Sequence, residues 1–262
     1  MTTIDLGSQY LRATCEKGVL RVALDRPDRR NACTIEMYHG IKKAAVIAEN
    51  DSDVDVLVLT GTGDVFCPGG EMSGKHEGGA GLDRDTDRFD LIPFVQLERC
   101  PKTVITAVNG LCQGGGVNML LMSDLAIASD RATFRVPELL RGVADCFLSS
   151  RLAERIGVAR AKDLLFTARS FGAAEALAMG LVARVAPHAE LQAAVDALID
   201  EVRETAPGAR AAVKRDINRN LPRIDFEMFA ESLRGDEVAE GFRAFTEKRP
   251  PRWTLAKTNR RR

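Results

Sequence analysis

Strand-like and helix-like runs alternate through the first half of the chain, and this alternation constrains the fold more than any other feature. Apolar, β-branched runs predict two strands within residues 11–26, around a turn at Lys17-Gly18, and further strands at 54–63, 102–110 and 123–130. Helical spacing occupies the intervening stretches 31–50, 88–100 and 114–122, with Thr34 as a predicted N-cap. Strand–helix units that recur in this way predict an α/β layer architecture.

Helical patterns dominate from Asp145 onward. They cover residues 147–157, 159–169, 172–180, 191–204 and 226–249. One apolar helical stripe carries Leu191, Val195, Leu198 and Val202. Amphipathic helices at this end of the chain are typical of packing against another chain. We therefore expect a core domain over residues 1–195 and a helical oligomerisation region over 196–262.

The charge balance and the cysteine content exclude several classes of protein. The chain has 37 Lys+Arg and 37 Asp+Glu, whereas nucleic-acid binders usually carry a basic excess. It contains neither a signal-peptide core nor an apolar run near the roughly 18 residues that span a bilayer. Its six scattered cysteines form no C-x-x-C pair. These features predict a soluble, cytoplasmic protein with no metal and no nucleic-acid or membrane partner.

Two strand ends open into glycine-rich backbone. The run Gly114–Gly116 precedes an apolar helix-like stretch, and Gly69-Gly70 comes after the strand 54–63, a turn and Phe66. A helix N-terminus carries free N–H groups, and glycine lets a ligand approach the backbone closely. Two such places can direct two N–H donors at one oxygen, which is the layout of an oxyanion hole. The alternative is that the glycines only permit close packing of helix on strand.

Three other active-site motifs are absent or incomplete. Residues 69–75 read G-x-x-x-x-G-K, but His76 stands where a P-loop needs the Ser or Thr that binds magnesium. No G-x-G-x-x-G follows a strand, and no G-x-S-x-G is present. Neither a dinucleotide-binding fold nor a serine hydrolase is therefore predicted, and His76 is interpreted as a solvated loop residue.

Six segments together form a specific combination: 22–32 (VALDRPDRRNA), 56–72 (VLVLTGTGDVFCPGGEM), 107–129 (AVNGLCQGGGVNMLLMSDLAIAS), 132–142, 166–187 and 240–253. With them the chain resembles the crotonase, or enoyl-CoA hydratase/isomerase, superfamily over nearly its whole length. The resemblance implies a crotonase-like spiral of ββα units with a helical C-terminal trimerisation region. It also implies a homotrimer or a dimer of trimers, and an acyl-CoA substrate in which coenzyme A is part of the substrate and not a cofactor.

The resemblance further implies roles for individual residues. The N–H groups of Gly70 and Gly115 would hold the thioester oxygen of the acyl-CoA. Contacts with coenzyme A are implied for Arg29, Arg30 and Ala32 and, reaching over from a neighbouring subunit, for Phe245 and Lys248.

One carboxylate of the family pattern is missing. Hydratases of this family place two glutamates at the substrate double bond, and this chain has Asn118 at the first position and Glu138 at the second. Asparagine can hold a water but cannot take its proton. Asp145 lies near a carboxylate used by dienoyl-CoA isomerases, although an N-cap for the helix after it is the favoured role. Glu138 is interpreted as catalytic, with a surface glutamate at a helix start as the alternative.

The expected protein is an enzyme of the enoyl-CoA hydratase/isomerase type that stabilises a thioester enolate. A single base favours isomerisation of a double bond over efficient hydration. Two alternatives stay open: an enoyl-CoA hydratase that uses Glu138 alone, and a non-catalytic acyl-CoA binding protein.

Overall fold

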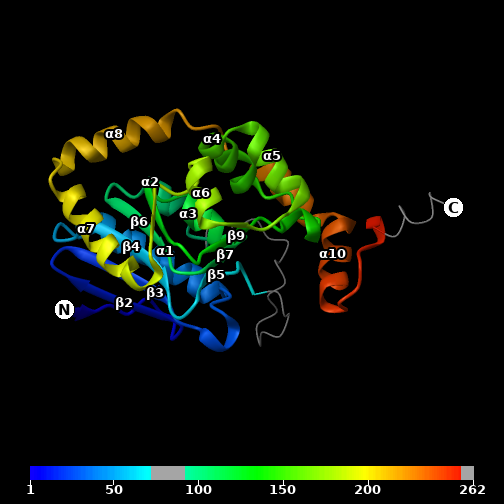
Figure 1. Cartoon of the computed structure of the whole chain (residues 1–262), viewed down its shortest axis with the longest axis horizontal. Coiled ribbons are helices and arrows are strands. Elements are labelled where there is room, and N and C mark those ends of the chain that lie inside the picture. The colour runs from blue at the N-terminus through cyan, green and yellow to red at the C-terminus, as the bar shows by residue number, and fades with distance from the viewer. Residues whose placement is uncertain (72–91, 255–262) are drawn as a thin grey trace.

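A seven-stranded sheet forms the centre of the computed structural model, which describes residues 1–71 and 92–254 (Figure 1). The strand order is β1-β2-β3-β4-β6-β8-β11. The bounds are β1 Thr2–Thr3, β2 Leu11–Glu16, β3 Val19–Leu24, β4 Val56–Gly61, β6 Thr103–Val108, β8 Leu125–Ser129 and β11 Arg184–Ala186. The first three strands pair antiparallel, and every pairing from β3 to β11 is parallel. The predicted turn joins β2 to β3, with positive φ at both Lys17 and Gly18.

The middle strands of this sheet are buried on both faces. In β4, Val56 and Val58 belong to one core while Leu57 and Leu59 belong to the other, because successive side chains point to opposite sides of a strand. Helix α1 (Ile35–Asn50) covers the leucine side, and helix α7 (Leu191–Arg203) covers the valine side (Figure 1). Helices on both faces of a mostly parallel sheet confirm the predicted α/β architecture.

A smaller sheet has the strand order β10-β9-β7-β5. Three of its strands each come directly after a strand of the large sheet along the chain. Its strands are β5 Val65–Cys67 after β4, β7 Leu111–Gln113 after β6, β9 Thr133–Arg135 after β8, and β10 Phe171–Gly172. Gly61 and Gly110 let the two sheets approach closely, because a Cβ at either position would collide with the backbone at Asp64 or Val65. The repeat of strand, turn and strand builds the spiral that the sequence predicts.

Two predicted helix boundaries can be compared with the structure. The Thr34 Oγ1 accepts a hydrogen bond from the Met37 N–H at 3.2 Å, which confirms the N-cap of α1. Helix α2 (Phe94–Arg99) begins only after Pro93, which lies at its N-cap and not within a kinked helix. The first part of the predicted helix 88–100 lies outside the described residues.

The second half of the chain is helical, as predicted. It contains a π-helical turn η4 at Leu148–Leu152, then α4 Ala153–Ile156, α5 Val158–Thr167, α6 Ala173–Met179 and α7 Leu191–Arg203. The predicted stripe of α7 is buried against β4, β6 and β8. The expected domain boundary between residues 195 and 196 falls inside α7, and the division into two regions stays a prediction.

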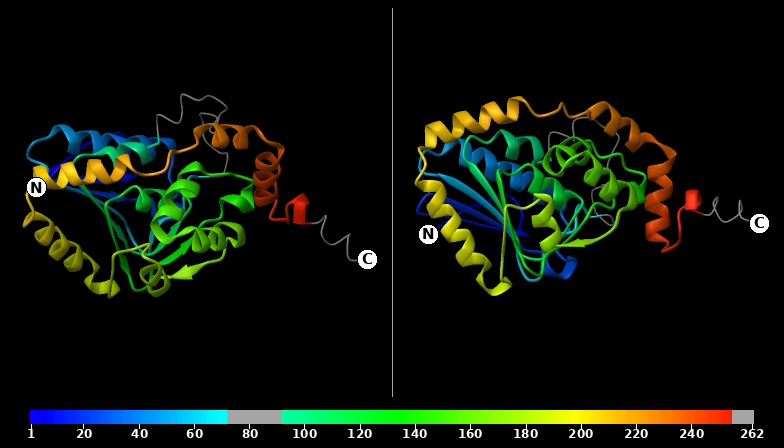
Figure 2. Two further views of the ribbon diagram at one scale, coloured as in Figure 1. Left: turned by 90° about the horizontal axis from the view of Figure 1, so that it is seen from above. Right: turned by 45° about the horizontal axis from the view of Figure 1, so that its top comes forward.

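Three further helices run along one side of the molecule, from the end that carries α7 to the opposite end (Figure 2). They are α8 Pro207–Arg219, α9 Phe226–Arg234 and α10 Asp236–Thr246. The predicted helix 226–249 is broken at Gly235, whose extended backbone ends α9 and begins α10. Helix α8 buries no residue, and both Val213 and Ile217 are 58% exposed. Within the described ranges, no helix is long and apolar enough to cross a membrane.

Candidate active site

The two glycine stretches that the sequence singles out lie side by side. A Cβ at Gly69 would be 3.2 Å from the Gly115 nitrogen. Cys33 fixes this arrangement from the other side, because its N–H donates to the Gly69 carbonyl at 2.9 Å and its carbonyl accepts from the Glu71 N–H at 2.8 Å. Strand ends β5 and β7 therefore bring Gly70 and Gly115 to one place.

An ion pair that sequence analysis missed supports the first glycine stretch. The Arg26 guanidinium donates to the Glu71 carboxylate and to the Ala32 carbonyl, the latter at 3.1 Å. Both charged side chains are only 8% exposed, so the pair is shielded from water. The pair connects the segment before α1 to Glu71, the residue that follows Gly70.

Glu138 directs its carboxyl group into the same place. It follows Pro137 at the start of the 3₁₀ turn η3 (Glu138–Arg141), and its Oε1 lies 2.7 Å from where a Cβ of Gly114 would be. Its Oε2 is buried and has no hydrogen-bond partner within the described part of the chain. Burial and the nearby charge of Asp145 raise the pKa of Glu138 to about 8. The carboxyl group of Glu138 is therefore not at the surface, and both of its protonation states are accessible near neutral pH.

Asp145 joins the site through Asn118. Its Oδ1 accepts from the N–H groups of Phe147 and Leu148 at 2.8 and 2.9 Å, which is the capping role favoured by the sequence. Its Oδ2 accepts from the Asn118 Nδ2 at 2.9 Å. The Asn118 side chain is 1% exposed, and its Oδ1 has no partner among the residues described. Burial raises the pKa of Asp145. Asp145 thus caps a helix and holds the amide of Asn118 at the same time.

Tyr38 is a site residue that sequence analysis missed. It belongs to α1, and its hydroxyl lies 3.6 Å from the position of a Cβ on Gly70 and closer still to that of Gly115. The only signal in the sequence is a tyrosine beside the buried face of a helix, which is too common to indicate a site. Only tertiary packing brings its hydroxyl to the glycines.

A family model described as enoyl-CoA hydratase/isomerase matches residues 14–256. The chain belongs to the enoyl-CoA hydratase/isomerase family. Enzymes with several named activities are similar to it. A carnitinyl-CoA dehydratase of Proteus mirabilis is 32% identical over 260 residues, with 94% of this chain and 98% of that protein covered. A mevalonyl-coenzyme A hydratase of Aspergillus fumigatus is 29% identical over 250 residues, with 91% and 92% covered.

The solved structures agree with this assignment. An enoyl-CoA hydratase from Mycobacterium avium subsp. paratuberculosis superposes with a TM-score of 0.81 at 28% identity, covering 92% of this chain and 97% of that chain. A carnitinyl-CoA hydratase from Mycobacterium avium gives the same TM-score at 28% identity, with 93% and 98% covered. The spiral fold is therefore that of the family, and the chain is an enzyme of the enoyl-CoA hydratase/isomerase family.

The positions implied for coenzyme A binding lie in two parts of the chain, the turn after β3 and the end of α10. Arg29 and Arg30 are exposed in the turn that follows β3, and Ala32 is partly buried beside Arg26. Phe245 lies near the end of α10, where the Arg141 guanidinium of η3 sits 4.0 Å above its ring. Lys248 follows with a positive φ of 53°. In this hydratase/isomerase fold, α10 therefore packs against the segment that carries Glu138.

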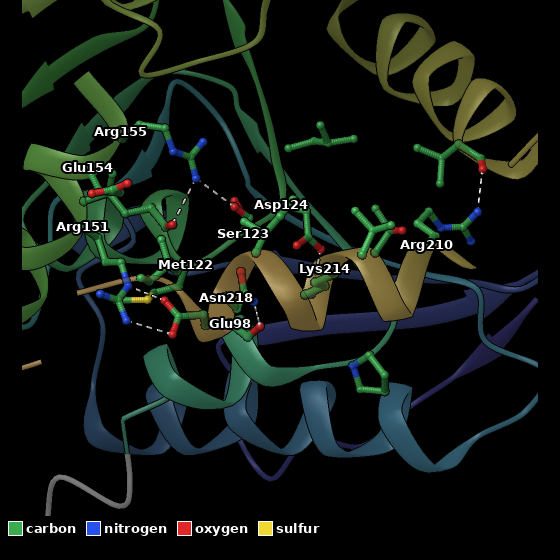
Figure 3. A pocket seen from close by; sticks show the side chains of 18 residues that line it. Glu98, Met122, Ser123, Asp124, Arg151, Glu154, Arg155, Arg210, Lys214 and Asn218 are labelled. Carbon is green, nitrogen blue, oxygen red and sulfur yellow. Dashed lines mark hydrogen bonds and ion pairs between the residues drawn. The ribbon is translucent and has the colours of Figure 1, made fainter. Parts of the chain in front are cut away.

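A hollow of about 440 Å³ lies away from these residues, beneath α8 (Figure 3). Most of its charged groups are bonded to other groups of the protein. Lys214 donates to Asp124 at 2.7 Å, Arg155 donates to the carbonyls of Leu121 and Ser123, and Arg151 forms a two-pronged pair with Glu98. None of the predicted site residues lines this hollow. Lys214 attaches α8 to the body of the family fold.

Proposed function

We propose that the chain transfers a proton on an acyl-CoA thioester through an enolate, with Glu138 as the single base. The observation that carries the proposal is the Glu138 carboxyl, whose Oε1 lies beside Gly114 and whose Oε2 is buried without a hydrogen-bond partner among the described residues. The N–H groups of Gly70 and Gly115 would bind the enolate oxygen. Each donor of this kind is worth about 3–4 kcal/mol in comparable oxyanion sites.

The chemistry at position 118 supports a one-base reaction. Asn118 cannot accept a proton, and both oxygens of Asp145 already accept hydrogen bonds. Glu138 is then the carboxyl left to act. As a carboxylate it would remove a proton from one carbon of an unsaturated acyl chain and, once protonated, return it to another carbon of the dienolate. A pKa near the working pH suits a group that must both take and give a proton.

Hydration or dehydration is the second candidate. The buried Asn118 Oδ1 has no partner in the described ranges, and it can accept a hydrogen bond from a water or from a substrate hydroxyl. Relatives named carnitinyl-CoA dehydratase and mevalonyl-coenzyme A hydratase carry out this type of reaction. In that case Glu138 alone would exchange the proton of the water.

The other implied features are part of the proposal. An acyl-CoA would contact Arg29, Arg30 and Ala32 of one subunit and Phe245 and Lys248 of a neighbouring subunit. Residues 196–262 would mediate a homotrimer or a dimer of trimers, which the unburied apolar residues of α8 support. The enzyme would act in the cytoplasm and would need no cofactor.

The test is turnover of two substrates by wild type and Glu138→Gln. We expect the wild type to isomerise trans-3-hexenoyl-CoA faster than it hydrates crotonyl-CoA. Glu138→Gln keeps the shape and removes the basicity, so both activities should fall by roughly 10²–10⁴-fold. Glu227→Gln, at an exposed position in α9, is the matched control. Full activity of Glu138→Gln would contradict the proposal, and binding without any turnover in the wild type would favour a non-catalytic acyl-CoA binding protein.

A further inference from the structure

Tyr38 places a phenol between the two glycines of the proposed oxyanion hole. Apart from chain neighbours, its hydroxyl and ring are the only described atoms within 4 Å of a Cβ built on Gly70, at 3.6 and 3.7 Å. The same hydroxyl is the nearest such atom to a Cβ built on Gly115, and it would collide with that Cβ. The hydroxyl therefore lies beside both glycines.

The ring of Tyr38 is held by a chain of aromatic contacts. It meets Phe94 of α2 edge to face, with ring centres 5.8 Å apart and planes at 74°. Phe94 in turn meets Phe147 at 4.9 Å, and the Phe147 N–H is bound to Asp145. The elements that carry Tyr38 and Asp145 are thus packed together through edge-to-face aromatic contacts. These contacts fix the direction of the hydroxyl.

The surroundings of the phenol keep its proton in place. Burial, together with the thiols of Cys33 and Cys67 and the carboxyls of Asp145 and Glu138, holds the pKa of Tyr38 well above its ordinary value. A protonated phenol donates one hydrogen bond. Among the described groups at this place, the Asn118 Oδ1 and any ionised carboxyl of Glu138 or Asp145 only accept hydrogen bonds. In those states they cannot stabilise negative charge on a substrate oxygen.

We propose that the Tyr38 hydroxyl is a catalytic group that donates a third hydrogen bond to the thioester oxygen of bound acyl-CoA. This inference rests on the proposed function, since it takes Gly70 and Gly115 as the other two donors. The phenol keeps its proton throughout, and its hydrogen bond strengthens as the carbonyl oxygen becomes an enolate oxygen. The phenol would then contribute mainly to the rate constant and little to substrate binding.

Tyr38→Phe tests the proposal, because it removes one oxygen and keeps the edge-to-face contact between the ring and Phe94. Tyr10→Phe removes the same atom from the other tyrosine of the chain and is the matched control. Two readouts are needed: kcat and KM for the unsaturated acyl-CoA that the wild type turns over, and the absorption shift of bound 2,4-hexadienoyl-CoA, which reports polarisation of its carbonyl. We expect Tyr38→Phe to lose roughly 10²-fold in kcat with little change in KM, and to shift the absorption less than the wild type does.

The two readouts separate failure of this inference from failure of the proposed function. A wild type that shifts the absorption and turns over substrate, with Tyr38→Phe identical to it in both, would overturn only the role of Tyr38. A loss of kcat with an unchanged absorption shift would also overturn it, because the hydroxyl would then act elsewhere than at the thioester oxygen. A wild type that neither shifts the absorption nor turns over substrate would overturn the proposed function, and the role of Tyr38 with it.

Discussion

Polar side chains line the hollow beneath α8 and also the glycine site, but their hydrogen-bonding differs between the two places. Beneath α8, Lys214 meets Asp124, and Arg151 meets Glu98. At the glycine site, the Glu138 Oε2 and the Asn118 Oδ1 are buried without partners in the described part of the molecule. A buried polar atom without a partner costs about 1–3 kcal/mol, so a fold keeps such atoms where they serve another purpose.

The difference separates structural from functional polarity. Paired charges satisfy each other and attach one element to the next. Unpaired oxygens beside glycine backbone leave hydrogen-bonding capacity that a ligand can use. Substitutions in the two regions should therefore affect different quantities. Those beneath α8 should lower stability, and those at the glycines should lower turnover.

The largest effect is expected from Gly115→Val. The new side chain would collide with the Tyr38 hydroxyl and fill the place proposed for the thioester oxygen. Turnover should fall by at least roughly 10³-fold, the scale of losing an oxyanion donor. Gly172→Val is the control, because nothing described lies within 4 Å of its Cβ position and its φ of −99° suits valine. Wild-type kcat/KM in a folded Gly115→Val protein would remove the oxyanion assignment.

Restoring the missing carboxylate should give a smaller gain. In Asn118→Glu the new carboxylate would face Asp145, and two adjacent carboxylates do not both ionise readily. Asn118→Glu combined with Asp145→Asn should therefore hydrate crotonyl-CoA faster than Asn118→Glu alone. We expect the double variant to gain about 10²-fold over wild type, the lower end of general-base catalysis.

Asn118→Gln is the control for that experiment, because it adds the same methylene without a charge. Equal hydration by the glutamine and glutamate variants would show that shape, and not basicity, limits the reaction at position 118.

Beneath α8 the expected effect is on stability. Lys214→Met leaves Asp124 without its ion partner and should lower the free energy of unfolding by about 1–3 kcal/mol. Thermal unfolding measures the loss, at roughly 2–4 °C per kcal/mol for a chain near this size. The kcat of the folded variant should match wild type, and exposed Lys162→Met should change neither quantity. A Lys214→Met protein that is stable but inactive would reverse the contrast between the regions.

The smallest effect is a displacement of the pH profile. Because the pKa of Glu138 is raised to about 8, its carboxyl is mainly neutral below that pH. Isomerisation begins with the carboxylate, so kcat/KM should rise with pH and level off above about 8. Asp145→Asn removes a charge that raises this pKa, and the midpoint should move to lower pH. Asp216→Asn, which removes an exposed charge on α8, should leave the midpoint in place.

Local patterns predicted the frame well. The turn at Lys17-Gly18, the Thr34 cap and the stripe of α7 each depend on residues near one another in the chain, so periodicity and capping rules apply to them. The meeting of two glycine stretches was also predictable, since both follow strands of one sheet. Sequence analysis missed helix α8 because polar residues occupy nearly all of its faces, so its sequence shows little apolar periodicity.

The rest of the site depends on tertiary packing. The contact between Asn118 and Asp145 joins groups 27 residues apart, and no local spacing encodes it. Tyr38 reaches the glycines only because α1 packs across β3 and β4, which the order of residues does not reveal. The raised pKa of Glu138 likewise arises from burial by several segments. Sequence patterns name candidates, while packing decides which of them meet.

Helix α8 has one more consequence, for the motions of the chain. A helix that buries none of its side chains is held by its own backbone bonds and by a few ionic anchors such as Lys214. Its amide protons should exchange with deuterated solvent through local opening, far sooner than those of β4 or β6, which are released only when the whole core opens. If exchange at α8 slows as the protein concentration rises, another subunit covers this helix in the assembled protein.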